Sequence, residues 1–217
     1  MFKNKTILCI SAHMDDIEFG CAGLIKTLEN DSVIYVLALS KDRKDSKGSI
    51  QEVRDLDEQY KSLEFLNVPK SNLFISENIP GQLFPEYRQE ILEEMYRVKS
   101  LINPDIVITT SENDIHQDHR TVNKCAQKAF SRTTRLSYEI VNATDGFLPN
   151  IFFEITEEAL KAKVMAIDSY KTQQDSSITS GDYFSEEIIK SLAVSRGARV
   201  GVKYAEAFEC ENILIGL

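Results

Sequence analysis

Residues 6–28 decide the fold, and they read TILCISAHMDDIEFGCAGLIKTL. Residues 6–12 (TILCISA) are an apolar run of the length and composition of a buried strand. Residues 19–28 then change to the spacing of an amphipathic helix. A buried strand that leads directly into a helix is the repeating unit of parallel sheets, because each parallel strand needs a crossover connection. This stretch therefore predicts an α/β fold.

The same alternation of apolar runs and helical stretches continues along the chain. Further strands are expected at residues 33–39, 73–75, 106–110, 136–141, 151–155 and 207–215. Helices are expected at residues 50–66, 86–102, 120–130, 156–170 and 185–200. Since no linker or repeat interrupts this pattern, it predicts one domain over residues 1–217, with a Rossmann-like, doubly wound and mostly parallel sheet covered by helices on both faces.

The composition restricts the class of partner. The chain has 217 residues, with 25 Lys and Arg against 34 Asp and Glu, and a formal net charge of −9. A field of that sign repels nucleic-acid phosphates and anionic lipid. No apolar run reaches the roughly 18 residues of a membrane span, the start shows no signal-peptide pattern, and the four cysteines form no close pairs. We therefore expect a cytoplasmic protein that binds neither nucleic acid nor a membrane.

The expected topology also indicates where a ligand would bind. In doubly wound sheets, ligands bind beyond the carboxyl ends of the strands, at the point where the strand order reverses. For the common order 3-2-1-4-5 this point lies between the first and fourth strands, which are followed here by residues 12–20 and 111–120. These two loops contain all three histidines of the chain, His13, His116 and His119.

Carboxylates accompany the histidines, since Asp15 and Asp16 follow His13 and Asp118 precedes His119. Imidazole nitrogens and a carboxylate oxygen suit Zn²⁺, and three protein ligands leave a fourth position for water. Any one of these aspartates could instead cap a helix N-terminus: Asp15 or Asp16 for the helix that follows them, and Asp118 for the next. The whole set, on two loops that the fold brings together, favours a metal site.

Residues 12–18 read AHMDDIE and residues 116–119 read HQDH. In this they resemble the PIG-L/LmbE-like zinc-dependent N-deacetylases, whose motifs are Ala-His-Pro-Asp-Asp with a nearby Glu, and His-x-Asp-His. Met14 replaces the proline and changes no ligand position. Residues 19–23 (FGCAG), 170–173 (YKTQ) and 201–208 (GVKYAEAF) resemble further segments of the family, so the resemblance spans nearly the whole chain.

The resemblance implies a hydrolase in which His13, Asp16 and His119 hold Zn²⁺, or another divalent transition metal such as Fe²⁺. It also implies that Asp15 is the general base. This role is chemically sound, because zinc lowers the pKa of bound water toward 7 and a carboxylate can then take the proton.

The resemblance gives the second motif a role in stabilising the transition state. His116, fixed by Asp118 through its other ring nitrogen, would donate a hydrogen bond to the tetrahedral oxyanion. Acetate and a free amine would be the products. The sequence leaves open whether Asp15 or His116 protonates the leaving amine.

Two further residues have alternative interpretations. Arg54 lies where the family carries an arginine and is expected to contact the substrate. The alternative is a surface arginine paired with Glu52 or Glu58. Glu18 could orient a metal ligand, or it could be an acidic residue favoured by the helix dipole in a first turn.

The expected substrate is a small N-acetylated sugar or glycoside of the N-acetylglucosamine type, since family members act on such units. An acidic chain without a membrane segment favours a soluble substrate over an inositol lipid. A homo-oligomer is left open, because some family members assemble as trimers or hexamers.

Two alternative functions keep the same fold: an amidase that cleaves a larger acyl or aminoacyl amide, and a non-catalytic metal- or sugar-binding protein. Asp15 argues against the second, because a binding site gains nothing from a spare carboxylate beside the metal. A nucleotide-binding protein is disfavoured, since the loop after the first strand has neither a GxGxxG nor a GxxxxGK[ST] motif.

Overall fold

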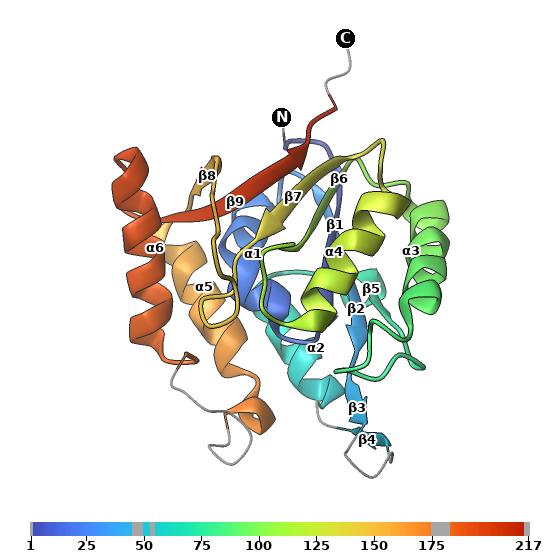
Figure 1. The fold of residues 1–217 in the computed structure, drawn as a ribbon. Coiled ribbons are helices and arrows are strands. Elements are labelled where there is room, and N and C mark those ends of the chain that lie inside the picture. The colour runs from blue at the N-terminus through green and yellow to red at the C-terminus, as the bar shows by residue number, and fades with distance from the viewer. Residues whose placement is uncertain (1, 45–49, 53–54, 175–182, 215–217) are drawn as a thin grey trace.

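The computed structural model describes residues 2–44, 50–52, 55–174 and 183–214. Its centre is a seven-stranded sheet in the order β5-β2-β1-β6-β7-β9-β8 (Figure 1). These strands are β1 (Thr6–His13), β2 (Val33–Ser40), β5 (Leu73–Ile75), β6 (Ile106–Thr110), β7 (Thr134–Tyr138), β8 (Ile151–Glu154) and β9 (Ala205–Asn212). Within this order β5, β2, β1, β6 and β7 pair in parallel, and β9 is antiparallel to both of its neighbours. The predicted mostly parallel, doubly wound sheet is confirmed.

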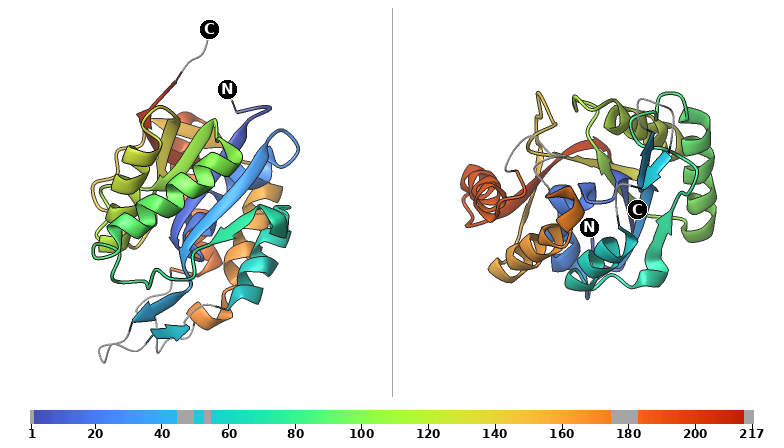
Figure 2. Two further views of the ribbon diagram at one scale, coloured as in Figure 1. Left: turned by 90° about the vertical axis from the view of Figure 1, so that its right-hand side faces the viewer. Right: turned by 90° about the horizontal axis from the view of Figure 1, so that it is seen from below.

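Helices cover both faces of this sheet (Figure 2). They are α1 (Asp16–Leu28), α2 (Leu56–Phe65), α3 (Arg88–Ile102), α4 (Gln117–Ala129), α5 (Glu157–Asp168) and α6 (Glu186–Val200), with short 3₁₀ turns η1 (Lys70–Asn72) and η2 (Lys171–Gln173). The helices α3 and α4 pack together on one face, whereas α1, α2 and α5 pack on the other. The helix α6 lies beside β9 and β8, the last two strands at one end of the sheet.

The alternation of side chains along β1 explains why both faces are covered. Ile7 and Cys9 belong to the buried cluster formed with α1 and α5, while Leu8 and Ile10 belong to the cluster formed with α3 and α4. Successive side chains of a strand point to opposite faces, so an uninterrupted apolar run needs apolar cover on both sides.

Some element boundaries differ from the expected ones. The helix expected from residue 50 begins only at Leu56, where the Asp55 carboxylate accepts a hydrogen bond from the Asp57 N–H at 2.9 Å. Residues before it form β4 (Ile50–Glu52), which pairs with β3 (Asp42–Lys44) in a separate two-stranded sheet. The strands expected at residues 136–141 and 207–215 are β7 and β9, and each begins two residues earlier than expected.

The order of the strands places the loops that carry the histidines. Strand β1 pairs with β2 on one side and with β6 on the other, so the chain reverses its direction of winding between β1 and β6, as expected. The loops that leave β1 and β6 therefore lie at the same edge of the sheet. Among the described residues, no helix combines the length and the apolar character needed to cross a membrane.

Candidate metal centre

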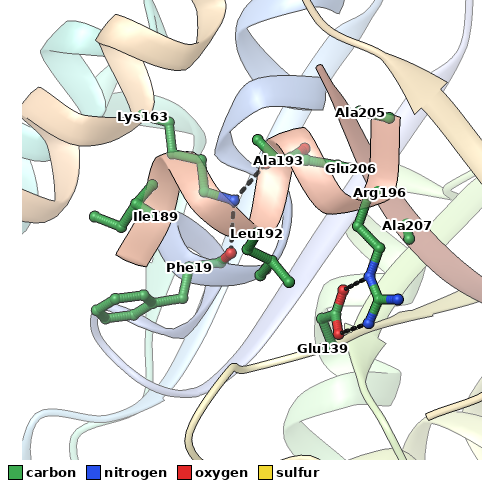
Figure 3. A pocket seen from close by; sticks show the side chains of 11 residues that line it. Phe19, Glu139, Lys163, Ile189, Leu192, Ala193, Arg196, Ala205, Glu206 and Ala207 are labelled. Carbon is green, nitrogen blue, oxygen red and sulfur yellow. Dashed lines mark hydrogen bonds and ion pairs between the residues drawn. The ribbon is translucent and has the colours of Figure 1, made fainter. Parts of the chain in front are cut away.

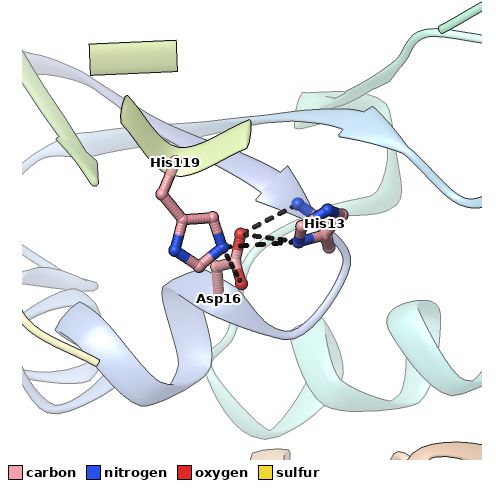
Figure 4. A group of neighbouring side chains, drawn as sticks. All are labelled: His13, Asp16 and His119. Carbon is pink, nitrogen blue, oxygen red and sulfur yellow. Dashed lines mark hydrogen bonds and ion pairs between the residues drawn. The ribbon is translucent and has the colours of Figure 1, made fainter. Parts of the chain in front are cut away.

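Three side chains of the two motif loops converge at this edge (Figure 4). His13 is the last residue of β1, Asp16 is the first residue of α1, and His119 lies in the first turn of α4. All three are buried, with relative exposures between 4% and 6%. The ring of His116 lies beside both other imidazoles, with centroids 5.0 Å from His13 and 4.7 Å from His119.

The distances within this group fit a small tetrahedral ion. His13 Nδ1 and His119 Nε2 are 3.4 Å apart, and Asp16 carboxylate oxygens lie 3.4 Å from His119 Nε2 and 3.8 Å from His13 Nδ1. Ligand atoms about 2.0–2.1 Å from a tetrahedral centre are separated from one another by about 3.3–3.4 Å. The donor set of two imidazoles and one carboxylate is also one that Zn²⁺ prefers. The residues present therefore fit a zinc ion.

A carboxylate holds the outer nitrogen of each of these two imidazoles. His13 Nε2 lies 2.9 Å from Asp118 Oδ2, and His119 Nδ1 lies 2.7 Å from Asp114 Oδ2. Both rings are thereby turned so that their other nitrogens face each other. Such outer carboxylates fix the tautomer of a ligating histidine and raise its basicity.

The contact of Asp118 corrects an expectation from the sequence, which assigned this carboxylate to His116. Asp118 Oδ2 is 4.0 Å from His116 Nδ1, too far for a hydrogen bond, and it binds His13 instead. The ring of His116 has a different partner, because it caps α4: its Nδ1 accepts from the Asp118 N–H at 3.1 Å.

The surroundings of the ring and this cap together define the protonation state of His116. Burial and the nearby charges of His13 and His119 lower the pKa of His116 to about 4, so its ring is neutral at pH 7. Because Nδ1 accepts from a backbone N–H, the hydrogen of the neutral ring must lie on Nε2. His116 therefore offers its Nε2 as a hydrogen-bond donor.

The buried group behaves electrostatically as a cation site. Burial by itself would raise the pKa of Asp16, but the positive charges of His119 and His13 hold it well below its usual range. Burial likewise opposes the charged form of His119, but the carboxylates of Asp16 and Asp114 outweigh it and raise the pKa of His119 to about 10. Two carboxylates thus stabilise a positive charge at the position where a metal ion would replace a proton.

The turn between β1 and α1 is strained. Asp15 is 7% exposed and has a φ of 115°, in the region that favours glycine. It occupies the N-cap position of α1, yet its side chain makes no capping hydrogen bond. The Asp16 carboxylate turns back to accept from the His13 N–H at 2.8 Å. The alternative in which these aspartates only cap a helix is therefore wrong for both, and the cap of α4 is His116 and not Asp118.

Asp114 is the residue of this site to which the sequence assigned no role. Besides holding His119, it accepts from the His116 N–H through Oδ1 at 2.7 Å. One carboxylate thus positions both histidines of the second motif. Its place in the same polar loop was the only signal in the sequence, and spacing alone does not tell which aspartate faces which ring.

Of the two other candidate residues, the structure describes only Glu18, and it does not bring Glu18 to this group. Glu18 is fully buried, and its Oε1 accepts from Gln59 (3.1 Å), Ser62 (2.6 Å) and Tyr170 (2.9 Å), so it contacts α2 and the end of α5 and not a histidine. Burial raises the pKa of Glu18 to about 7. Arg54 lies outside the described residues.

Comparison with known proteins places this chain in a family. Residues 8–130 match the family model described as "PIG-L: GlcNAc-PI de-N-acetylase", and the chain belongs to the PIG-L family. It is 27% identical to the uncharacterized deacetylase YaiS of Escherichia coli K12, over 78% of this chain and 92% of that protein. It is 25% identical to the diacetylchitobiose deacetylase of Thermococcus kodakarensis, over 93% of this chain and 81% of the other.

A solved structure shares the fold. The N,N'-diacetylchitobiose deacetylase from Pyrococcus horikoshii superposes with a TM-score of 0.71 at 20% identity, covering 94% of this chain and 83% of that one. The family match and the two sequence relatives support a hydrolytic N-deacetylase.

Proposed function

We propose that this protein is a metal-dependent N-deacetylase that removes the acetyl group from an N-acetylglucosamine-type sugar or glycoside. One observation carries the proposal: His13 Nδ1 and His119 Nε2 face each other at 3.4 Å beside Asp16, and a carboxylate holds each outer nitrogen. Membership of the PIG-L family and the similarity to a diacetylchitobiose deacetylase support the reaction and the class of substrate.

His13, Asp16 and His119 would hold the metal, with Zn²⁺ as the ion that best fits the donor set. Once bound there, zinc supplies a Lewis acid for the amide carbonyl and lowers the pKa of water. Fe²⁺ is an alternative with similar ligand preferences.

Asp15 would act as the general base of the reaction. It stands next to Asp16 in the strained turn and is buried, and it is not one of the three side chains whose ligand atoms converge at the proposed metal position. As a carboxylate that stands next to a metal ligand and is not itself a ligand, it would take the proton of the attacking water.

His116 would stabilise the charge that develops on the carbonyl oxygen. Its neutral ring carries a hydrogen on Nε2, and the hydrogen bond from the Asp118 N–H to Nδ1 holds the ring in place before the reaction begins. A preorganised donor of this kind is the usual way in which enzymes stabilise an oxyanion.

A screen for amine release tests this function. Zinc-loaded protein would be assayed against diacetylchitobiose and against N-acetylglucosamine glycosides: free, malate-linked, inositol-linked and nucleotide-linked. We expect amine release from at least one N-acetyl sugar, loss of that activity after chelation, and its return with zinc. Matched substrates with longer acyl or aminoacyl groups distinguish a deacetylase from a broader amidase.

Zinc-loaded protein that releases no amine from any N-acetyl compound would contradict the proposal. Faster cleavage of the longer acyl amides would replace it with the amidase alternative.

A further inference from the structure

The helix α1 is interrupted next to the proposed metal ligands. Cys21 has φ −148° and ψ 15°, which no α-helical residue adopts. In a continuous helix the Gly23 N–H would donate to the Phe19 carbonyl four residues earlier. The break separates these two backbone groups within the buried interior, where each needs another partner.

A buried ion pair from distant segments supplies both partners, and Figure 3 shows the contacts of its lysine with the Phe19 carbonyl and with Glu206. Lys163 Nζ of α5 donates to the Phe19 carbonyl at 2.7 Å, and the Glu206 carboxylate of β9 accepts from the Gly23 N–H at 2.9 Å and from the Leu24 N–H at 2.7 Å. Lys163 Nζ and Glu206 Oε1 are 2.6 Å apart. The Phe19 carbonyl and the Gly23 N–H are thus joined through Lys163 and Glu206, and the same carboxylate also takes the Leu24 N–H.

The helix is shaped to admit this pair. A Cβ atom on Gly23 would lie 3.0 Å from Glu206 Cδ and 2.8 Å from Ile155 Cδ1, so any other residue here would press on the carboxylate and on Ile155. A Cβ atom on Gly20 would lie 2.2 Å from the ring of Tyr138. Gly23 thus gives the Glu206 carboxylate room beside the backbone, while Gly20 gives room to the ring of Tyr138.

Stability alone does not explain a helix break that is bridged by a buried ion pair. Lys163 and Glu206 have side-chain exposures of 6% and 5%, and the desolvation of two buried charges is expensive. Apolar side chains of similar size often give a fold of equal or greater stability, and an unbroken helix would leave no backbone group to satisfy. The break instead separates the first turn of α1 from the rest of the helix, and this turn carries Asp16.

The pair is connected to that turn directly. The carbonyl of Phe19 is held by Lys163, and the N–H of Phe19 donates to the Asp15 carbonyl at 3.3 Å. We propose that Lys163 and Glu206 are positioning residues, which hold the first turn of α1 so that the Asp16 carboxylate stays aligned with His13 and His119. This inference rests on the proposed function in taking Asp16 as a metal ligand.

The first test measures metal binding in the double variant Lys163→Met/Glu206→Gln, which leaves no uncompensated buried charge. We expect its affinity for Zn²⁺ to fall about 10- to 100-fold, the usual effect of losing a group that orients a ligand. The absorption spectrum of the Co²⁺-substituted protein should also change, because it reports the geometry of the ligands.

The matched control is Glu139→Gln. Glu139 pairs with Arg196 at 2.7 and 2.5 Å in the same small cavity, and both side chains line it together with Lys163 and Glu206 (Figure 3). These two hydrogen bonds join the side chains of Glu139 and Arg196 to each other and not to the backbone of α1. This variant should bind both metals like the parent. A folded double variant with the parent's zinc affinity and cobalt spectrum would overturn the inference.

The second test uses the parent protein and does not depend on a variant that folds. If the pair is coupled to the metal site, zinc must in turn stabilise the contacts of the pair, because coupling free energies are reciprocal. Hydrogen exchange of the Gly23 and Leu24 amides should therefore slow by a larger factor on zinc binding than that of Met95, which is buried in α3.

An equal or smaller factor at Gly23 and Leu24 than at Met95 would refute the coupling and leave the metal centre intact. A parent protein that binds no zinc would refute the proposed function and this inference together.

Discussion

At the scale of single residues, the candidate site depends on which carboxylate faces which imidazole. Asp114 and Asp118 lie in one short loop, but Asp114 holds His119 while Asp118 reaches across to His13 on another strand. The Asp118 carboxylate also accepts from the Phe84 N–H at 3.2 Å, and the positive charge and hydrogen bond of His13 keep its pKa below the usual value although burial opposes this. The Asp118 carboxyl is therefore ionised at neutral pH, and it can accept a hydrogen bond from His13 Nε2.

Asp118→Asn should weaken metal binding without removing a ligand. The amide keeps the shape of the side chain but loses the charge that fixes His13 Nε2. We expect about a 10- to 100-fold loss of zinc affinity, measured by competition with a chelating dye. Glu112→Gln, in the same loop, serves as a control and should bind zinc like the parent. An unchanged affinity in Asp118→Asn would show that His13 needs no such partner.

Asp15→Asn separates an enzyme from a binding protein. Asparagine tolerates the left-handed backbone found at residue 15, so the turn should be kept. Zinc should remain bound, whereas deacetylation should fall by about 10²- to 10⁴-fold, because the amide cannot take a proton from water. Metal analysis and steady-state kinetics on the same sample check both parts. Loss of zinc would mean that Asp15, and not Asp16, is the ligand.

At the scale of elements, α1 joins the site to the rest of the molecule through both of its halves. The second half is held by Glu206, and the first turn buries Glu18 against α2 and Tyr170. Burial raises the pKa of the Glu18 carboxyl from 4.5 to about 7. Its protonated form is therefore favoured in the folded chain relative to the unfolded one.

The burial of Glu18 predicts a pH-dependent stability. A raised folded pKa gives a stabilisation that is complete below pH 4.5 and is lost as the pH rises through about 7. The difference in pKa corresponds to about 3 kcal/mol. Glu18→Gln removes this titration, so its free energy of unfolding relative to the parent should increase by up to that amount between pH 5 and pH 8. Urea unfolding at both pH values measures it.

The exposed variant Glu90→Gln on α3 is the control, and its stability relative to the parent should not depend on pH in this range. Parallel pH profiles for the parent and Glu18→Gln would show that Glu18 is ionised in the folded chain.

At the scale of the whole molecule, a bound ion would link three segments: the end of β1, the start of α1 and the first turn of α4. A ligand that binds only the folded state stabilises it by about 2.7 kcal/mol at a free concentration of 100 Kd. For a chain of this size that corresponds to a rise in Tm of roughly 5–10 °C.

We therefore expect a zinc-dependent rise in Tm in the parent that chelation reverses. His119→Ala should lose this rise together with most of the bound metal, because the remaining groups cannot complete the site. Scanning calorimetry with metal analysis provides both readings. Full metal occupancy in His119→Ala would show that this histidine is not a ligand.

Local patterns in the sequence determined the class of fold and the place of the site. Apolar runs of strand length, separated by helical spacing, predict parallel strands because burial on both faces leaves its mark in each segment separately. The rule that ligands bind at the reversal of strand order then brings residues 12–20 and 111–120 together, and the structure places His13, Asp16 and His119 within 4.8 Å of one another.

Only the tertiary structure decided which side chains orient the site. The bond between His13 and Asp118 joins residues 105 apart in the chain, and that between Glu206 and Gly23 joins residues 183 apart. Such partners depend on the direction of each side chain across packed elements, which neither spacing nor composition records. The break of α1 at Cys21 could not be predicted for the same reason, because the helical pattern of this segment continues through it. The groups that bind the freed Phe19 carbonyl and Gly23 N–H are Lys163 of α5 and Glu206 of β9, which are distant in sequence.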